Sequence, residues 1–353
     1  MRNLIVPMAG KSSRFPNMRP KWMLTHPMTN RFMCVESILG LNTDFFDKIY
    51  FVCLEEHEEK YSFSKSLNKQ IDDLGLKNKT EIVYLKNQTK SQSETVYNLL
   101  KESEINGFIF IKDSDSYYEC EVKNENNQVV FFDLNDMDDI NARTKSYIQF
   151  DINGLITNIV EKKVISSTFS VGGYAFSSAK EFCNTYEKFQ TFSDECYISH
   201  IIFDMILSGS LFCGLRSSNF KDWGTIESWD KYKNDYKCFF IDIDGTLVEN
   251  SSVHFSPYIG EGKPLQKNID LIQRLYKSGK VKIILTTSRP EEVRSVTIEE
   301  MDRNGILYDQ LIMGLPHCKR ILINDFANTN QYPSCEVINI LRNSDNLSDF
   351  IIL

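Results

Sequence analysis

A loop of small residues and cations near the N-terminus has the composition of a phosphate-binding site. The apolar run at residues 4–6 predicts a short buried strand, and the segment after it, residues 7–21, is rich in Gly, Ser and Pro. Small residues let the backbone approach a ligand closely, and its N–H groups can then hold phosphate oxygens. Arg14 and Lys21 add the positive charge that a triphosphate needs. Taken alone, a Gly/Ser turn with two solvated cations is the simpler interpretation.

Two carboxylates one residue apart, Asp242 and Asp244, mark a second chemical site. They follow the apolar run at 238–241 and precede Gly245 and Thr246, so a buried strand ends in an acidic turn. Side chains at positions i and i+2 past a strand end can face the same space. Such a pair suits a nucleophile beside an acid–base group, or the ligands of a divalent cation. A random acidic turn is the alternative.

The pattern around the first cluster predicts an α/β domain. Strands are expected at 48–54, 80–85, 107–111 and 146–150, with helical patterns between several of them, for example at 94–101. Strands that alternate with helices predict a mostly parallel sheet. From 115 to about 164 the pattern is richer in β-strand, and residues 151–156 predict a hairpin turn.

A second cycle of strand, loop and helix begins at Cys238. Its expected elements are a helix at 268–278, a strand at 281–286, a helix at 291–304 and a strand at 320–323. The segment before it, 229–237, is charged and rich in tyrosine and has no clear period. Because 353 residues exceed what one core usually supports, we place a boundary near Lys237, giving domains of residues 1–237 and 238–353.

Composition argues against several classes of protein and partner. The net charge is −8, and no basic face typical of nucleic-acid binding is visible. The nine cysteines include no Cys-x-x-Cys pair, which argues against a zinc site or a disulfide framework and favours reduced thiols in the cytoplasm. No signal peptide is recognisable, and no stretch reaches the roughly 18 apolar residues of a membrane span. We therefore expect neither nucleic acid nor a membrane among the partners.

Six short motifs occur in order along the first 230 residues. The first is Pro-x-Ala-Gly-x-Ser-Ser-Arg…Pro-Lys at residues 7–21. The others are Gln92-Ser93-Glu94-Thr95, Lys112-Asp113-Ser114-Asp115-Ser116, Val160-Glu161-Lys162-Lys163, Val171-Gly172-Gly173-Tyr174 and Asp222-Trp223-Gly224-Thr225. Together they resemble the sugar-phosphate nucleotidyltransferases, and six matches in order are far more specific than one. The resemblance implies a Rossmann-like sheet, mixed but mostly parallel, for residues 1–237.

The resemblance also implies a role for each motif. It makes nucleotide-binding residues of Met8, Ala9, Gly10, Lys11, Ser12 and Gln92, acceptor-binding residues of Glu161, Lys162 and Gly173, catalytic cations of Arg14 and Lys21, and Mg²⁺ ligands of Asp115 and Asp222. Asp113 is an alternative to Asp115, because the sequence offers both. In the implied reaction an acceptor phosphate attacks the α-phosphorus of a nucleoside triphosphate. Lysines, arginine and magnesium neutralise the repulsion between these two anions.

Two details bear on the choice of nucleotide. Lys11 stands where many relatives carry an apolar residue or glycine, and residues 19–24 include an aromatic residue, Trp22, next to Lys21. Both features resemble nucleotidyltransferases of bacterial capsule and cell-surface pathways, some of which use CTP. CTP is therefore the expected nucleotide, with UTP, GTP and dTTP as alternatives. The expected acceptor is a phosphorylated sugar or another small phosphomonoester, and a homo-oligomer stays open.

Three further motifs follow Asp242-Ile243-Asp244-Gly245-Thr246 in the second domain. They are Thr286-Thr287-Ser288-Arg289-Pro290, Lys319 and Asn324-Asp325. The set resembles phosphatases of the haloacid dehalogenase class. This implies Asp242 as the nucleophile that forms an aspartyl-phosphate, Asp244 as general acid and base, and Thr287 and Lys319 as phosphate contacts. It also implies Mg²⁺ held around Asp242, Asp244 and Asp325, with less negative charge than usual because Asn324 replaces a common aspartate.

The combined prediction is a bifunctional, magnesium-dependent enzyme that makes an activated precursor of surface polysaccharide. One domain transfers a nucleotidyl group and the other hydrolyses a phosphomonoester. Only about 20 residues separate Val248 from the next predicted helix, so we expect an α/β domain with little or no cap over the second site. The alternative is a regulatory or scaffolding protein with decayed folds, but the charged residues of both motif sets are intact.

Overall fold

The computed structural model describes residues 1–353 except 11, 13, 138–143, 191–195, 326–334 and 352–353. The chain divides into two compact units, Met1–Tyr232 and Lys233–Leu353. Helix α7 (Ile226–Asn234) crosses this division, although its segment has no clear period. Its Trp229 packs edge-on against Trp223, so tertiary contact stabilises a helix that periodicity does not predict. The predicted boundary, Lys237, is the first residue of the next strand.

The N-terminal unit is built on a mixed sheet, which has nine strands among the described residues. Strands β3, β2, β1 and β4 are parallel neighbours in that order, in agreement with the predicted mostly parallel sheet. Strand β9 runs antiparallel to β4 and β6, β10 is parallel to β6, and β7 and β8 form a hairpin beside β9. The bounds are β1 (Arg2–Pro7), β2 (Lys48–Leu54), β3 (Thr80–Leu85), β4 (Phe108–Lys112), β6 (Gln128–Asp133), β7 (Ser146–Phe150), β8 (Ile156–Glu161), β9 (Thr168–Phe176) and β10 (Cys213–Arg216).

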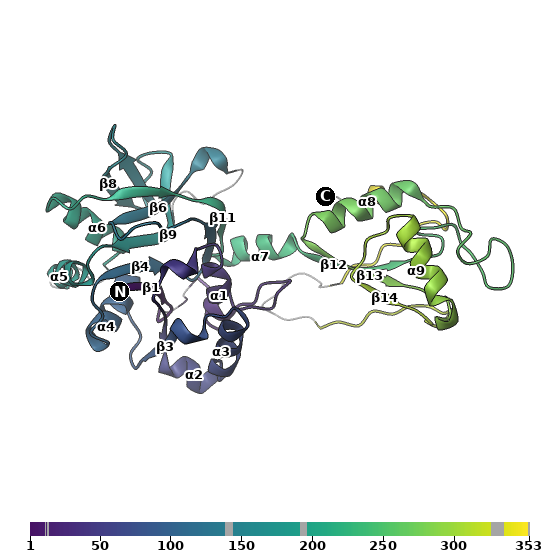
Figure 1. Ribbon diagram of the computed structural model, residues 1–353, viewed down its shortest axis with the longest axis horizontal. Helices are drawn as coiled ribbons and strands as arrows, with labels where there is room; N and C mark the ends of the chain where they lie inside the picture. Colours follow the sequence, from purple (N-terminus) through teal and green to yellow (C-terminus); the bar gives the residue numbers. More distant parts are fainter. Residues whose placement is uncertain (11, 13, 138–143, 191–195, 326–334, 352–353) are drawn as a thin grey trace. The chain divides into compact units, whose positions relative to one another are not determined.

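Helices cover both faces of this sheet (Figure 1). Alternate residues of β1 point to opposite faces, so Leu4 and Val6 belong to one buried cluster and Ile5 to the other. Helices α1 and α3 pack into the first cluster, and α4, α5 and α6 pack into the second. The bounds are α1 (Met33–Ile38), α2 (Glu55–Tyr61), α3 (Ser64–Asp73), α4 (Gln92–Glu102), α5 (Ala179–Phe189) and α6 (Ile198–Leu207).

Capping explains where α4 begins. The prediction started this helix at residue 94, but it begins at Gln92. The hydroxyl of Ser91 accepts the N–H of Glu94, and the carboxylate of Glu94 accepts the N–H of Lys90. These reciprocal bonds satisfy backbone donors that the first turn of a helix leaves without partners. The predicted strands at 48–54, 80–85, 107–111 and 146–150 are confirmed to within one residue.

A separate two-stranded antiparallel sheet joins β5 (Ser116–Glu119) to β11 (Ser218–Asp222). Its register places Asp222 opposite Ser116. Two segments about a hundred residues apart in the chain therefore meet at this point. The pairing carries the third and sixth motifs of the N-terminal set to one place.

The C-terminal unit contains a parallel three-stranded sheet in the order β12–β13–β14, within the part of the chain that is described. Its elements are β12 (Lys237–Asp242), α8 (Gln266–Lys277), β13 (Val281–Thr286), α9 (Arg294–Arg303) and β14 (Gln310–Ile312). The predicted helix at 291–304 is divided into a 3-10 turn, Glu291–Val293, and α9. One apolar cluster, including Ile243, Ile269 and Ile283, forms the core.

The predicted strand at 320–323 is wrong. Residues 321–325 have no regular structure, and Ile321, Leu322 and Ile323 are 73%, 54% and 92% exposed. So short a strand is stable only when a neighbour supplies backbone hydrogen bonds. Among the described strands, β12 pairs with β13 alone and offers this segment no ladder. Apolar composition alone was therefore not enough to predict a strand at 320–323.

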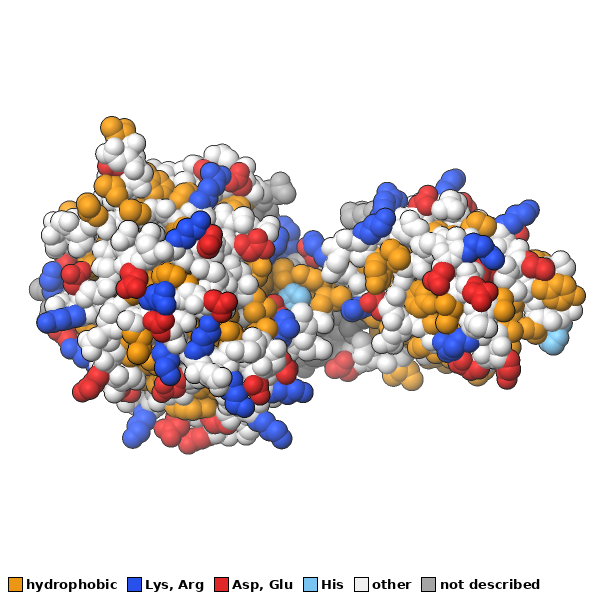
Figure 2. All heavy atoms as spheres, viewed as in Figure 1, with side chains coloured by type: hydrophobic (Ala, Val, Ile, Leu, Met, Phe, Trp, Pro, Cys, Tyr) orange, Lys and Arg blue, Asp and Glu red, His pale blue; other side chains and the backbone are white. Residues whose placement is uncertain are grey.

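The surface carries charges of both signs. On the face shown in Figure 2, basic and acidic side chains are interspersed over the described residues. All nine cysteines are free thiols. Among the helices in the described ranges, none is both long and apolar enough to cross a membrane.

Candidate functional site

The N-terminal loop, residues 7–21, begins with buried side chains and then opens. Met8 and Ala9 are buried at the carboxyl end of β1. A β-carbon added to Gly10 would meet no other atom within 4 Å, so there is space beside the backbone at this point. That space is what the close approach of a phosphate requires. Lys11, also predicted to bind the nucleotide, lies outside the described residues.

Ser12 forms the turn of this loop. Its φ is +48°, and its carbonyl accepts the N–H of Phe15 at 2.8 Å. Its hydroxyl accepts the N–H of Lys21 at 3.3 Å, which brings that lysine back to the turn. Phe15 is buried in a cluster with Trp223. The loop is therefore anchored beside the segment that carries the sixth motif.

Asp115 and Asp222 lie close together and form a carboxylate pair. Asp222 is opposite Ser116 in the two-stranded sheet, and the N–H of Trp223 donates to the carbonyl of Asp115 at 2.9 Å. A β-carbon on Gly224 would lie 3.1 Å from Oδ1 of Asp222 and 3.4 Å from Oδ2 of Asp115. The two side chains predicted to bind magnesium therefore face one small space.

Three cations surround the carboxylate pair. The Lys21 ammonium bonds to Asp115, and Nζ of Lys145 lies 2.6 Å from Oδ2 of Asp222. Arg14 is the third cation, because its Nη1 would lie 3.4 Å from a β-carbon added to Gly224. Burial raises the pKa of Asp115, but the cations, Lys21 foremost, outweigh burial and hold its pKa well below the usual value. Asp115 is thus ionised, as a metal ligand must be.

Asp113 has a different environment. The side-chain amide of Gln92 donates to its carboxylate, and its own N–H donates to the carbonyl of Gly172 at 2.8 Å. Burial, and then the charge of Asp115, raises the pKa of Asp113. The two candidate metal ligands are therefore distinguished electrostatically, in favour of Asp115. Gln92, which was predicted to bind the nucleotide, contacts an aspartate here.

The predicted acceptor residues Glu161 and Lys162 lie at the end of β8. The carboxylate of Glu161 accepts the hydroxyls of Ser146 and Ser199, the latter at 3.0 Å. Nζ of Lys162 donates to the hydroxyl of Tyr197 at 2.6 Å and lies 4.3 Å from the centre of that ring. The carboxylate of Glu161 and the ammonium of Lys162 are therefore both held by side chains at the start of α6.

Packing requires Gly173 to be a glycine. A β-carbon there would overlap the hydroxyl of Tyr118 and the side chain of Val130. Its strand partner across the β4–β9 pair is Lys112. Contact of Gly173 with an acceptor stays a prediction.

Motif reasoning missed two lysines beside the carboxylate pair. The ammonium of Lys112, which is fully buried, donates to the carbonyls of Asp113 at 2.8 Å and Ser116 at 2.7 Å. It therefore closes the turn that carries Asp115, and burial lowers the pKa of Lys112 to about 8 against the pull of the neighbouring carboxylates. Lys145 directly precedes β7. Lys112 stands in the third motif but was assigned no role, whereas Lys145 has no spacing signal and only its contact with the distant Asp222 reveals it.

The carboxylate pair fits a magnesium ion. Mg²⁺ in proteins is commonly held by one or two carboxylates together with substrate phosphates and water. Asp115 and Asp222 supply two such oxygen ligands at one point. Within the described residues, no group of three or more His, Cys, Asp or Glu side chains forms a complete cage. Phosphates and water would therefore complete the coordination shell.

Solved structures share the architecture of the N-terminal unit. A nucleoside-diphosphate-sugar pyrophosphorylase from Vibrio cholerae RC9 has a TM-score of 0.55 and 17% identity, covering 65% of this chain and 98% of its own. The N-terminal unit therefore shares the fold of this pyrophosphorylase. An inositol-1-phosphate CTP transferase from T. maritima has a TM-score of 0.50 and 15% identity, covering 66% of this chain and 94% of its own. A UDP-glucose pyrophosphorylase bound to UDP-glucose also has a TM-score of 0.50 and 14% identity. The match covers 66% of this chain and 97% of the pyrophosphorylase.

These likenesses show the fold alone, because the identities lie between 14% and 17%. The three solved structures each match 65–66% of this chain, which is the share that the N-terminal unit makes up, 232 of 353 residues. Compared with protein-family models and with curated proteins, the chain has no match. The function of either unit therefore has to be argued from its site.

In the C-terminal unit, Asp242 and Asp244 lie at the carboxyl end of β12. Asp242 is the last residue of that strand and lies opposite Thr286, the last residue of β13. Asp244 accepts the hydroxyls of Thr287 at 3.2 Å and Ser251 at 2.8 Å. Parallel strands end at the same edge of a sheet, which explains why these segments meet. The predicted residues Asp242, Asp244 and Thr287 are thus brought together.

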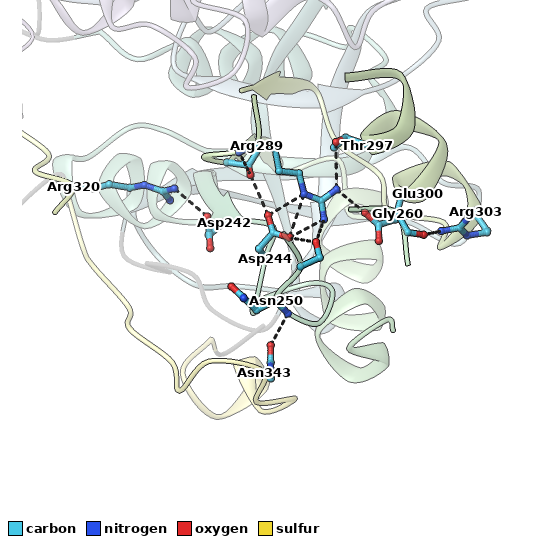
Figure 3. A network of polar contacts seen from close by, with 12 residues as sticks. Asp242, Asp244, Asn250, Gly260, Arg289, Thr297, Glu300, Arg303, Arg320 and Asn343 are labelled. Carbon is cyan, nitrogen blue, oxygen red and sulfur yellow. Dashed lines mark hydrogen bonds and ion pairs between the residues drawn. The ribbon is translucent and has the colours of Figure 1, made fainter. Parts of the chain in front are cut away.

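Arg289 holds Asp244 in place (Figure 3). Its Nε and Nη2 donate to the two carboxylate oxygens at 2.9 and 2.8 Å, and its Nη1 donates to Glu300 at 2.6 Å. Arg289 is 3% exposed and Glu300 is fully buried. Burial lowers the pKa of Arg289, but the two carboxylates outweigh burial and raise it. Sequence reasoning quoted Arg289 within a motif and assigned it no role.

The predicted metal ligands of this site do not form one cluster among the described residues. Nη2 of Arg320 lies 3.0 Å from Oδ1 of Asp242, a contact that was not predicted, and the role of Lys319 as a phosphate contact stays a prediction. Asp325 lies in the exposed segment 321–325, because no strand carries it to the sheet edge. In the described ranges no metal-binding cluster forms from Asp242, Asp244 and Asp325, and a guanidinium already holds Asp244. The residues as placed do not fit the predicted magnesium ion.

Proposed function

We propose that the N-terminal unit transfers a nucleotidyl group from a nucleoside triphosphate to a phosphorylated acceptor and releases pyrophosphate. The observation that carries this proposal is the carboxylate pair, Asp115 and Asp222, with Arg14, Lys21 and Lys145 around it. Ionised carboxylates beside several cations suit a magnesium nucleotide, since the metal and the phosphates each need a partner of opposite charge. The nucleotidyltransferase fold supports the same activity.

The proposed reaction is an exchange of one phosphoryl bond for another. An oxygen of the acceptor phosphate forms a bond to the α-phosphorus, the bond from that phosphorus to the bridging oxygen breaks, and pyrophosphate leaves. The ionised acceptor phosphate has no proton to lose. Mg²⁺ on the carboxylate pair would neutralise charge on the triphosphate. Lys21 and Arg14 stabilise the charge that develops on the phosphates, and Lys162 holds the acceptor phosphate.

The proposed nucleotide is CTP, with UTP, GTP and dTTP as alternatives. The structural relatives include proteins named for CTP and for UDP-glucose, so the fold favours no base. The proposed acceptor is a phosphorylated sugar or another small phosphomonoester, in synthesis of activated precursors for surface polysaccharide.

For the C-terminal unit we propose phosphomonoester hydrolysis. A carboxylate oxygen of Asp242 forms a bond to phosphorus while the ester bond breaks and Asp244 gives the leaving alcohol a proton. Water then attacks the aspartyl-phosphate and returns a proton to Asp244, which releases phosphate. Arg320 is placed to hold phosphoryl oxygens beside Asp242. The unassembled metal ligands support one competing function for this unit, a catalytically inactive regulatory module.

A screen of the full chain tests both activities. Pyrophosphate release would be measured with Mg²⁺ and each of CTP, UTP, GTP and dTTP, over a panel of sugar phosphates and small phosphomonoesters. One nucleotide and one acceptor class should give turnover that EDTA abolishes. No release with any pair, together with no nucleotide-dependent rise in melting temperature, would refute the transferase proposal. Phosphate release from p-nitrophenyl phosphate in the same preparation distinguishes a phosphatase from an inactive module.

A further inference from the structure

Lys145 lies between the two halves of the proposed transferase site. Its carbonyl accepts the N–H of Lys162 at 2.9 Å, because β7 and β8 pair with Ser146 opposite Glu161. Its backbone therefore belongs to the acceptor side. Its side chain reaches the other side, where Nζ lies 2.6 Å from Oδ2 of Asp222. The two side chains are only 14% and 19% exposed, so water screens this contact weakly.

A second contact holds the ammonium of Lys145 in this place. Nζ lies 5.3 Å from the ring centre of Phe220, a buried core residue of β11. An ammonium near an aromatic ring and a carboxylate is stabilised by both. The lysine is therefore positioned in the site and is not a solvated surface charge.

Each carboxylate of the pair is occupied by an ammonium. Lys21 contacts Asp115 and Lys145 contacts Asp222, while both carboxylates face the space beside Gly224. A divalent cation and an ammonium compete for one carboxylate oxygen, because both need the same negative charge at short distance. Binding of a metal to Asp222 therefore requires the ammonium of Lys145 to move to another anion.

We propose that Lys145 is a catalytic residue of the transferase, whose ammonium exchanges Asp222 for a phosphate oxygen when the site is loaded. The inference rests on the proposed function. While the acceptor oxygen bonds to the α-phosphorus and pyrophosphate leaves, Lys145 keeps its proton and neutralises charge on the phosphates. Because Lys145 lies between Lys162 and Asp222, its ammonium is expected to contact the phosphate oxygens where the acceptor phosphate meets the α-phosphate.

The test compares Lys145→Met and Lys145→Arg with a matched control, Lys69→Met. Lys69 is exposed on α3 and lies outside all six motifs and the proposed mechanism. The first measurement is binding of Mn²⁺ alone, from the electron paramagnetic resonance signal of the free ion. Lys145→Met should bind Mn²⁺ about tenfold more tightly, because Asp222 has lost a competing charge-assisted contact. Lys69→Met should bind it as the wild type does.

The second measurement is pyrophosphate release at saturating Mg²⁺. Lys145→Met should lose roughly 10²–10³ in rate, Lys145→Arg should lose less, and the control should match the wild type. Tighter metal binding with slower turnover distinguishes exchange of partners from general disruption, which would weaken both. A Lys145→Met rate equal to the control, or an unchanged Mn²⁺ affinity, would overturn the proposal. If the wild type releases no pyrophosphate from any nucleotide, the proposed function fails, and the Mn²⁺ titration alone still decides whether Lys145 competes for Asp222.

Discussion

Replacing Asp115 by asparagine is the most direct test of the proposed metal site. The substitution removes one negative charge and keeps the size of the side chain. Only 14% of the Asp115 side chain is exposed, and the Lys21 ammonium contacts it, so solvent cannot replace the lost charge. Charge-assisted contacts of this kind contribute about 1.5–3 kcal/mol, or roughly 10- to 150-fold in an equilibrium constant. We expect the Mg²⁺ concentration for half-maximal rate to rise by that factor.

The assay is the initial rate of pyrophosphate release against total Mg²⁺, at saturating nucleotide and acceptor. Asp113→Asn is the matched control, because an asparagine there can still accept the amide of Gln92 and the pKa of Asp113 is already raised toward the neutral form. The control should stay within about threefold of the wild type, less than 1 kcal/mol. If Asp113→Asn raises the Mg²⁺ requirement more than Asp115→Asn does, the choice of Asp115 as the ligand is refuted.

Other variants test the remaining assignments. Lys21→Ala should slow pyrophosphate release by roughly 10²–10³ and leave phosphate release unchanged; a near-normal transferase rate would remove Lys21 from the reacting phosphates. Asp242→Asn should abolish phosphate release from a small phosphomonoester, since an amide cannot accept the phosphoryl group, while transfer stays within a few-fold of wild type. Loss of both activities in a protein that still melts cooperatively would show that the two sites are interdependent. Arg289→Met leaves the buried Glu300 without its cation, and urea unfolding should show a loss of about 3–5 kcal/mol in the C-terminal unit; a loss below about 1 kcal/mol would contradict the role given to this ion pair. Burial raises the pKa of Cys53 to about 12, so the folded state keeps a proton that the unfolded thiol loses near pH 9. The free energy of unfolding should therefore fall, by up to about 1.4 kcal/mol per pH unit between about pH 9 and 12, more steeply in the wild type than in Cys53→Val, and equal slopes would disprove this.

Local patterns predicted most of the N-terminal fold. Alternation of strands and helices indicated a mostly parallel sheet, and β1, β2, β3 and β4 lie where apolar runs placed them. Strands β2 and β4 are buried along nearly their whole length, so their residues have to be mostly apolar, whereas most residues of β3 at the edge of the sheet are only partly buried or exposed. Apolar patterns failed to predict structure where an element is stabilised by contacts with residues distant in the chain. Helix α7 packs its Trp229 against Trp223, and the apolar residues at 321–323 pair with none of the described strands.

Local patterns were weaker for the site. They offered both Asp113 and Asp115 just after β4, and only the spacing of the resembled family favoured Asp115, with Asp113 as the alternative. The choice comes from partners distant in the chain: Gln92 contacts one carboxylate and Lys21 contacts the other. Lys145 had no signal at all, because its partner Asp222 is 77 positions away.

The sequence by itself determined which residue types stand at the strand ends: the N-terminal loop with Arg14 and Lys21, and the acidic turn with Asp242 and Asp244. These depend on neighbours in the chain, where spacing sets which side chains can face one space. Only the tertiary structure decided which charges meet. It paired Lys145 with Asp222 and Arg289 with Asp244, and it brought Arg320 to Asp242. The physical reason is that electrostatic energy depends on distance and burial, which strand pairing sets and one-dimensional spacing does not.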